Sequence, residues 1–207
     1  MSKMEKRSFT VTGLQTREEN GVGIVEGRPI VYDSPADIGG YFREVIAKGA
    51  LDGTDLTDVR LCLNHDTGYV YARSRRNNPN STMQLIPDDE GLRIRANLDI
   101  ANSPKAQDFY SAVKRGDMDT MSFMFDVSAQ DWQGLDSDYP TRTIKGLGTV
   151  VEVSAVTFPA YKDTSISARS QETLDNARAA LESARKRAVK EPLDNGIEVL
   201  KTKIKLL

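Results

Sequence analysis

The chain has 207 residues and a mass of 22.9 kDa, with 28 basic side chains against 30 acidic ones and a net charge of −2. This length supports one substantial hydrophobic core with an appendage rather than two full domains. The balanced charge provides no basic field to hold a phosphate backbone, which argues against nucleic acid as a partner.

Cys62 and His65 are the single cysteine and the single histidine of the chain. They exclude an internal disulfide and a zinc site with the usual four nitrogen or sulfur ligands, so we expect neither a metal nor another cofactor. The start of the chain lacks an apolar segment of signal-peptide length, and no run reaches ~18 apolar residues. We therefore expect an unsecreted protein with no membrane partner.

The first part of the chain is patterned for strands. Alternating segments at residues 8–12 and 22–32, punctuated by glycines, predict two early strands and a hairpin. Residues 41–50 have a short, mixed pattern, which predicts a helical turn or a connector. Residues 59–63 predict a strand that ends just before His65.

The middle of the chain combines a hairpin with a helix. Residues 82–87 and 91–99 predict two paired strands around an acidic turn. Ser103 and Pro104 supply an N-cap and a first-turn proline, and apolar residues then recur at helical spacing until Gly116.

The last part of the body returns to strands. Residues 121–127 predict a strand, residues 132–139 a polar insertion, and residues 142–144 and 149–158 the final strands. The whole pattern indicates a β-rich α+β protein with one clear helix in its body.

From residue 170 the pattern changes, because small apolar residues recur three and four apart among many charges until Pro192. We therefore divide the chain into a body, residues 1–169, and a helical tail with a frayed end, residues 170–207. The apolar side of this tail, which includes Leu174 and Leu181, is suited to docking on a partner.

Three polar residues lie in or beside apolar strand-like runs. His65 and Ser122 supply the base and the hydroxyl that a serine hydrolase needs. Glu152 needs a partner in its apolar run, so it is the candidate to orient His65. The alternative is a structural histidine, a serine bonded to backbone, and Glu152 paired with Arg142 or Arg93 across the sheet.

Five motifs in a fixed order resemble the HK97-type prohead protease family of tailed bacteriophages and prophages, over roughly residues 8–169. They are residues 42–50 (FREVIAKGA), 61–66 (LCLNHD), 88–92 (DDEGL), 115–123 (RGDMDTMSF) and 151–161 (VEVSAVTFPAY). Any one motif is weak, but five in this order, with the histidine and the serine inside two of them, are specific.

The resemblance implies a serine endopeptidase that acts in the cytoplasm of a bacterial host, inside the immature capsid. Its partners would be the major capsid protein, whose scaffolding segment it removes, and other copies of itself, which it digests. The implied fold is a β-barrel wrapped by helices, similar to the herpesvirus assemblin proteases. The family's nucleophile and base correspond to Ser122 and His65, and the acidic position of the Glu-Val-Ser motif corresponds to Glu152.

The expected reaction is acyl transfer, with Arg142 as a candidate oxyanion donor and Arg169 or a main-chain amide as alternatives. A rival interpretation is an assembly module of the same fold that has lost turnover and docks on capsid protein through Leu174 and Leu181. A nuclease based on residues 64–66 ranks third, because no second histidine or cluster of ligands would hold a catalytic ion.

Overall fold

A computed structural model describes residues 4–10, 14–157 and 174–189. Within them the chain forms eleven strands and two helices, which confirms the expected β-rich α+β class. The strands are β1 (Glu5–Thr10), β2 (Gln15–Glu19), β3 (Val22–Val31), β4 (Ala36–Ile38), β5 (Phe42–Ile46), β6 (Asp58–Leu63), β7 (Ala72–Arg75), β8 (Met83–Asp88), β9 (Gly91–Leu98), β10 (Thr120–Gln133) and β11 (Thr141–Val156). The helices are α1 (Pro104–Lys114) and a helix at residues 174–189.

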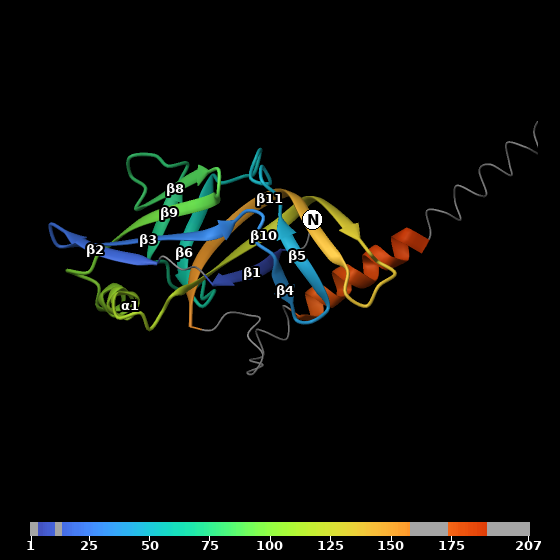
Figure 1. Cartoon of the computed structure of the whole chain (residues 1–207). Coiled ribbons are helices and arrows are strands. Elements are labelled where there is room, and N and C mark those ends of the chain that lie inside the picture. The colour runs from blue at the N-terminus through green and yellow to red at the C-terminus, as the bar shows by residue number, and fades with distance from the viewer. Residues whose placement is uncertain (1–3, 11–13, 158–173, 190–207) are drawn as a thin grey trace, which may run out of the picture.

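The strands form two sheets (Figure 1). The larger sheet has seven strands: β1, β10, β11, β5 and β4 follow one another, while β6 pairs with β11 and β7 pairs with β6. The smaller sheet has four strands in the order β2, β3, β9, β8. A closed barrel has no edge strands. Among the described strands, β2 and β8 are edges of the smaller sheet, and β1 and β4 end the larger one. The described strands therefore form two open sheets, whereas a single closed barrel was expected.

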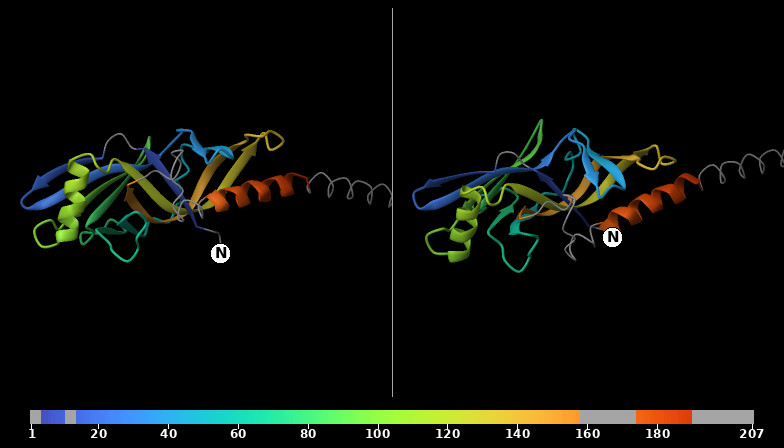
Figure 2. Two further views of the ribbon diagram at one scale, coloured as in Figure 1. Left: turned by 90° about the horizontal axis from the view of Figure 1, so that it is seen from below. Right: turned by 60° about the horizontal axis from the view of Figure 1, so that its bottom comes forward.

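The two helices lie at opposite ends of the molecule instead of wrapping around it (Figure 1, Figure 2). α1 packs near β2 and β3 of the smaller sheet, and the helix at residues 174–189 lies beside β4 and β5. Neither helix within these described residues has the length and apolar character needed to cross a membrane.

The main hydrophobic core joins residues of both sheets and α1 in one cluster. From the larger sheet, Phe123 and Phe125 of β10 are fully buried, with their ring centroids 4.7 Å apart. Ile30 of β3 and Ile94 of β9, from the smaller sheet, belong to the same cluster and are also fully buried. Because side chains alternate along a strand, Ser122 and Met124 occupy the other face of β10.

α1 begins and ends as its sequence predicts. The Ser103 hydroxyl accepts a hydrogen bond from the Ala106 amide at 3.2 Å, and Pro104 occupies the first turn. Gly116 follows the helix with a φ of 77°, a conformation that glycine adopts without a Cβ penalty.

Three predicted segments have a different structure. Residues 41–50 contain strand β5 rather than a helical turn. The strand pattern was hidden in the sequence because Glu44 occupies a buried position that an apolar residue normally fills. Residues 132–139 are only partly an insertion, since β10 continues to Gln133. The two predicted final strands are one strand, β11. Its pairing with β10 shifts register several times between residues 124 and 130 of β10, so β11 loses its simple alternation.

The helix at residues 174–189 packs on its own chain. Ala177 and Leu181 are buried in a second hydrophobic cluster with Ile38 of β4 and Phe42 of β5. The expectation that this side of the tail is open for a partner is therefore wrong at Leu181. The predicted boundary after residue 169 lies outside the described residues.

Candidate active site

Three adjacent strands bring the candidate residues together. Ser122 of β10 is paired with Ser154 of β11, and Ser154 is paired in turn with Cys62 of β6. β6 ends one residue later at Leu63, so the chain that follows it emerges beside the start of β10. His65 therefore lies next to the two strands that carry Ser122 and Glu152.

A tight turn directs the imidazole of His65 back over the sheet. Asn64 and His65 have φ values of 51° and 59°, in the left-handed region that residues other than glycine seldom adopt. Hydrogen bonds to the end of β11 help to hold the turn: the Asn64 amide donates to the Ala155 carbonyl at 2.9 Å, and the Thr157 amide donates to Asn64 Oδ1 at 2.9 Å. Backbone strain of this kind persists where surrounding contacts enforce it, and it is concentrated at functional sites.

The side chains of Ser122, His65 and Glu152 form one continuous chain of hydrogen bonds. His65 Nε2 lies 2.7 Å from Ser122 Oγ, and His65 Nδ1 lies 2.5 Å from Glu152 Oε1. Ser122 is fully buried and Glu152 is 2% exposed, whereas the imidazole is 13% exposed. A buried carboxylate, an imidazole and a hydroxyl in this order can move a proton from the hydroxyl to the imidazole.

Ser154 is bound to both Glu152 and His65, a role that was not expected from the sequence. Its hydroxyl donates to Glu152 Oε2 at 2.7 Å and accepts from the His65 main-chain amide at 3.1 Å. One side chain thus fixes both the carboxylate and the backbone of the histidine. The available signal was its position two residues after Glu152, which places both side chains on one face of β11.

The thiol of Cys62 lies beside the Glu152 carboxylate, but it is not in the deprotonated state of a reactive cysteine. Burial raises the pKa of the Cys62 thiol to about 12, and the charge of Glu152 and a hydrogen bond to it act in the same direction. The thiol is therefore protonated near neutral pH, while a nucleophilic cysteine needs its thiolate. This chemistry leaves Ser122 as the nucleophile candidate of the site.

Arg142 does not lie at this site, so its assignment as an oxyanion donor is wrong. It belongs to the opposite end of β11, on the order of 30 Å along the strand from Glu152 at ~3.3 Å per residue. There its guanidinium binds Glu5 in a bidentate pair at 2.7 and 2.8 Å, Glu44 at 2.9 Å and Gln130 at 2.6 Å. These partners, rather than substrate, explain why a fully buried cation is tolerated.

Two further expectations from the sequence concern arginines near the site. Glu152 is bound to His65 and Ser154, so the alternative pairing with Arg142 or Arg93 is not formed. Arg169, the second arginine considered as an oxyanion donor, lies outside the described residues. Among the residues that are described, no group of three or more His, Cys, Asp and Glu side chains is placed to hold a metal ion.

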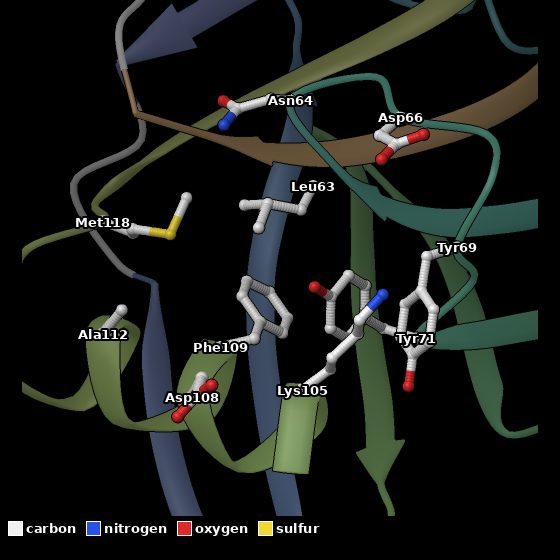
Figure 3. A pocket seen from close by; sticks show the side chains of 10 residues that line it. All are labelled: Leu63, Asn64, Asp66, Tyr69, Tyr71, Lys105, Asp108, Phe109, Ala112 and Met118. Carbon is white, nitrogen blue, oxygen red and sulfur yellow. The ribbon is translucent and has the colours of Figure 1, made fainter. Parts of the chain in front are cut away.

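A pocket of about 470 Å³ adjoins the histidine (Figure 3). Asn64 and Asp66, the two neighbours of His65 in the chain, both line it, and Met118 lines it from the segment that leads into β10. The remaining lining residues are Leu63, Tyr69, Tyr71, Lys105, Asp108, Phe109 and Ala112. The pocket therefore shares the His65 turn with the candidate triad.

Comparison with known proteins places the chain in a protein family. The sequence model of the Caudovirus prohead serine protease family matches residues 11–178, which contain Ser122, His65 and Glu152. The match extends beyond the body into the helix at residues 174–189. No curated protein and no solved structure matches the chain. Because the family match spans well over half of the sequence, the chain belongs to the Caudovirus prohead serine protease family.

Proposed function

We propose that this chain is a serine endopeptidase whose catalytic triad is Ser122, His65 and Glu152. The observation that carries the proposal is the unbroken hydrogen-bond chain from Ser122 Oγ through both ring nitrogens of His65 to Glu152, with heavy-atom distances of 2.7 and 2.5 Å. Nucleophile, base and orienting acid are recognised by this geometry, whatever the fold that holds them.

In the proposed reaction Ser122 Oγ attacks the carbonyl carbon of a peptide bond while His65 Nε2 takes its proton. The imidazolium then returns that proton to the leaving amine, which breaks the C–N bond and leaves an acyl-enzyme. Water hydrolyses the ester in the same way, with His65 again as base and then as acid. Glu152 accepts the Nδ1–H throughout, which holds the tautomer with a free Nε2 and stabilises the imidazolium.

The oxyanion of the tetrahedral intermediate needs hydrogen-bond donors. Since Arg142 is bound to Glu5 and Glu44 far along β11, we assign this role to main-chain amides near Ser122. Backbone amides serve this purpose in other serine hydrolases and carry no pKa of their own in the working range.

The proposed substrate is the scaffolding segment of the major capsid protein, together with copies of the protease itself. Membership of a prohead protease family supports action on phage capsid proteins inside the procapsid. Confinement in a shell raises the effective concentration of substrate, so tight intrinsic binding is unnecessary. A structural likeness to the herpesvirus assemblins stays a prediction from the family resemblance.

The test is to co-express the chain with the major capsid protein of the same phage or prophage and to measure intact masses. Ser122→Ala is the test variant, and Ser128→Ala is its matched control, because Ser128 lies on the same strand but is exposed. We expect a shortened capsid protein with the wild type and with Ser128→Ala but not with Ser122→Ala. Identical masses with all three proteins would instead favour an inactive assembly module.

A further inference from the structure

We propose that the pocket beside His65 is a specificity site that binds one large apolar side chain of the peptide substrate, such as phenylalanine, leucine or methionine. The proposal rests on the proposed protease function and adds the class of residue that the enzyme selects. It arises from the position of the pocket, the chemistry of its walls and the arrangement of its rim.

The position links the pocket to the reacting atoms. Asn64 and Asp66 line it and are covalent neighbours of His65, whose Nε2 is 2.7 Å from Ser122 Oγ. Consecutive Cα atoms are ~3.8 Å apart, so a peptide held at Ser122 can place a side chain close to the cut into this space. A pocket so close to the base is within reach of few substrate positions, which makes it a selective element.

The walls are apolar and largely aromatic. Tyr71 and Phe109 meet with ring centroids 4.7 Å apart, and Tyr69 meets Tyr71 at 4.8 Å. Leu63 and Met118 face them across the opening in Figure 3. Burial raises the pKa of the Tyr71 hydroxyl, in keeping with a poorly hydrated wall. Such walls favour an apolar occupant, because binding removes apolar surface of both the pocket and the substrate side chain from water.

Three charged residues line the pocket, and all three are exposed to solvent. The ammonium of Lys105 lies 4.4 Å from the centre of the Tyr69 ring, a cation–π arrangement. The Tyr69 hydroxyl is itself bonded to Ser103 Oγ at 2.9 Å. Asp66 and Asp108 are exposed, so their carboxylates face water and not an enclosed ligand. With Lys105 held against the Tyr69 ring and both carboxylates exposed, the aromatic and aliphatic walls are the part of the pocket that selects an occupant.

Ala112 gives a way to fill the pocket without disturbing the triad. It lines the pocket from α1, is only half-buried, and makes none of the hydrogen bonds around His65. Ala112→Phe therefore reduces the space for a substrate side chain. Gln107→Phe is the matched control, because Gln107 is exposed on the same helix and does not line the pocket.

The experiment is to digest a library of short synthetic peptides with wild type and both variants and to identify the cut sites by mass spectrometry. We expect the wild type to favour large apolar residues over alanine at one position near the cut by about 10- to 100-fold in kcat/KM. Ala112→Phe should lose that preference and cut small residues equally well, while Gln107→Phe should keep it. Thermal unfolding of the three proteins confirms that each is folded.

Cleavage without an apolar preference, or with a preference that Ala112→Phe leaves unchanged, would overturn the specificity site while leaving the protease function standing. A preference for acidic residues that disappears in Lys105→Gln would overturn it too. If no peptide is cut, the proposed protease function is refuted, and a binding experiment then tests the specificity site independently. N-acetylphenylalanine amide should then shift the NMR signals of Tyr71 and Phe109 in Ser122→Ala protein, N-acetylalanine amide should not, and equal responses would refute the pocket.

Discussion

Strand β11 carries two buried polar clusters, one at each end. Glu152 and Ser154 belong to the candidate active site, whereas Arg142 forms a cluster with Glu5 and Glu44 at the far end. In the sequence both Glu152 and Arg142 were charged candidates for the same site. Their partners distinguish them: one cluster contains an imidazole and a hydroxyl at hydrogen-bond distance, and the other contains a permanent cation bound by two carboxylates and the Gln130 side chain.

This difference separates chemistry from stability. The site cluster includes His65, and an imidazole can both accept and donate a proton during a reaction. An arginine is always protonated, so the Arg142 cluster has no proton to exchange. Changes in the first cluster should therefore reduce activity in a folded protein, and changes in the second should reduce stability with activity per folded molecule retained.

The largest effect is expected for Ser122→Ala. Loss of the nucleophile should lower kcat by about 10⁴- to 10⁶-fold, as for other triads whose members act as a unit. Because alanine leaves the apolar neighbours in place, we expect a melting temperature close to that of the wild type. A fluorophosphonate probe followed by mass spectrometry should label the wild type once, at Ser122, and should not label the variant. Labelling of a different serine would assign the nucleophile elsewhere.

The next largest effect is expected for Glu152→Gln compared with Glu44→Gln. Both residues are buried glutamates, at 2% and 1% exposure, but only Glu152 contacts His65. An amide favours the wrong tautomer of the imidazole, so Glu152→Gln should lower kcat by about 10³- to 10⁴-fold. Glu44→Gln should keep kcat within about twofold of wild type while lowering stability. Equal losses of kcat in both variants would remove the distinction between the two clusters.

Stability should respond most to Arg142→Met. Removing the guanidinium leaves the Glu5 and Glu44 carboxylates buried without their cation, which costs about 3–5 kcal/mol in the free energy of unfolding. The triple variant with Glu5→Gln and Glu44→Gln also removes the stranded charges and should recover part of that loss. Urea unfolding measures both, and the activity of the folded fraction should match the wild type. A lower kcat in fully folded Arg142→Met protein would instead indicate that Arg142 takes part in the reaction.

A smaller effect is expected for Glu5→Gln, since one carboxylate remains to neutralise Arg142. Glu5 belongs to β1, which pairs with β10 so that Ser8 lies opposite Ser122. Loss of the bidentate pair should cost about 1.5–3 kcal/mol locally and speed hydrogen exchange of the β1 amides at least tenfold. Hydrogen exchange followed by mass spectrometry checks this, with Glu19→Gln in the exposed part of β2 as control. Unchanged exchange in β1 would show that Arg142 does not anchor the strand.

The sequence predicts the local elements of this protein better than it predicts the assembly. The α1 cap at Ser103 and the hairpin of β8 and β9 were predicted because their signals lie within a few residues of one another. β5 was missed because Glu44 interrupts its apolar alternation, and the reason for that interruption is Arg142, which lies far along the chain. Pairing between distant strands carries no local signal of this kind.

The candidate site follows the same rule. Ser122, His65 and Glu152 were proposed from residue type and from the family motifs, and the structure brings these three together. Ser154 was missed and Arg142 was misassigned, because each depends on which strand is the neighbour of β11 at a given residue. The register of β11 against β5 and β6 decides this, and it is set by long-range packing.

The smallest expected effect concerns Cys62, which reports on the charge of the site. With its pKa raised to about 12, mainly by burial and secondarily by Glu152, the thiol has almost no thiolate at pH 9, where an exposed cysteine is largely reactive. Iodoacetamide should therefore modify it slowly in the folded protein and rapidly in urea, as mass spectrometry can measure. In Glu152→Gln protein the carboxylate no longer disfavours the thiolate, but burial remains, so the rate should rise only modestly. If iodoacetamide modifies either folded protein as fast as the unfolded chain, the Cys62 thiol is open to solvent. The strands beneath the site would then not be packed as described.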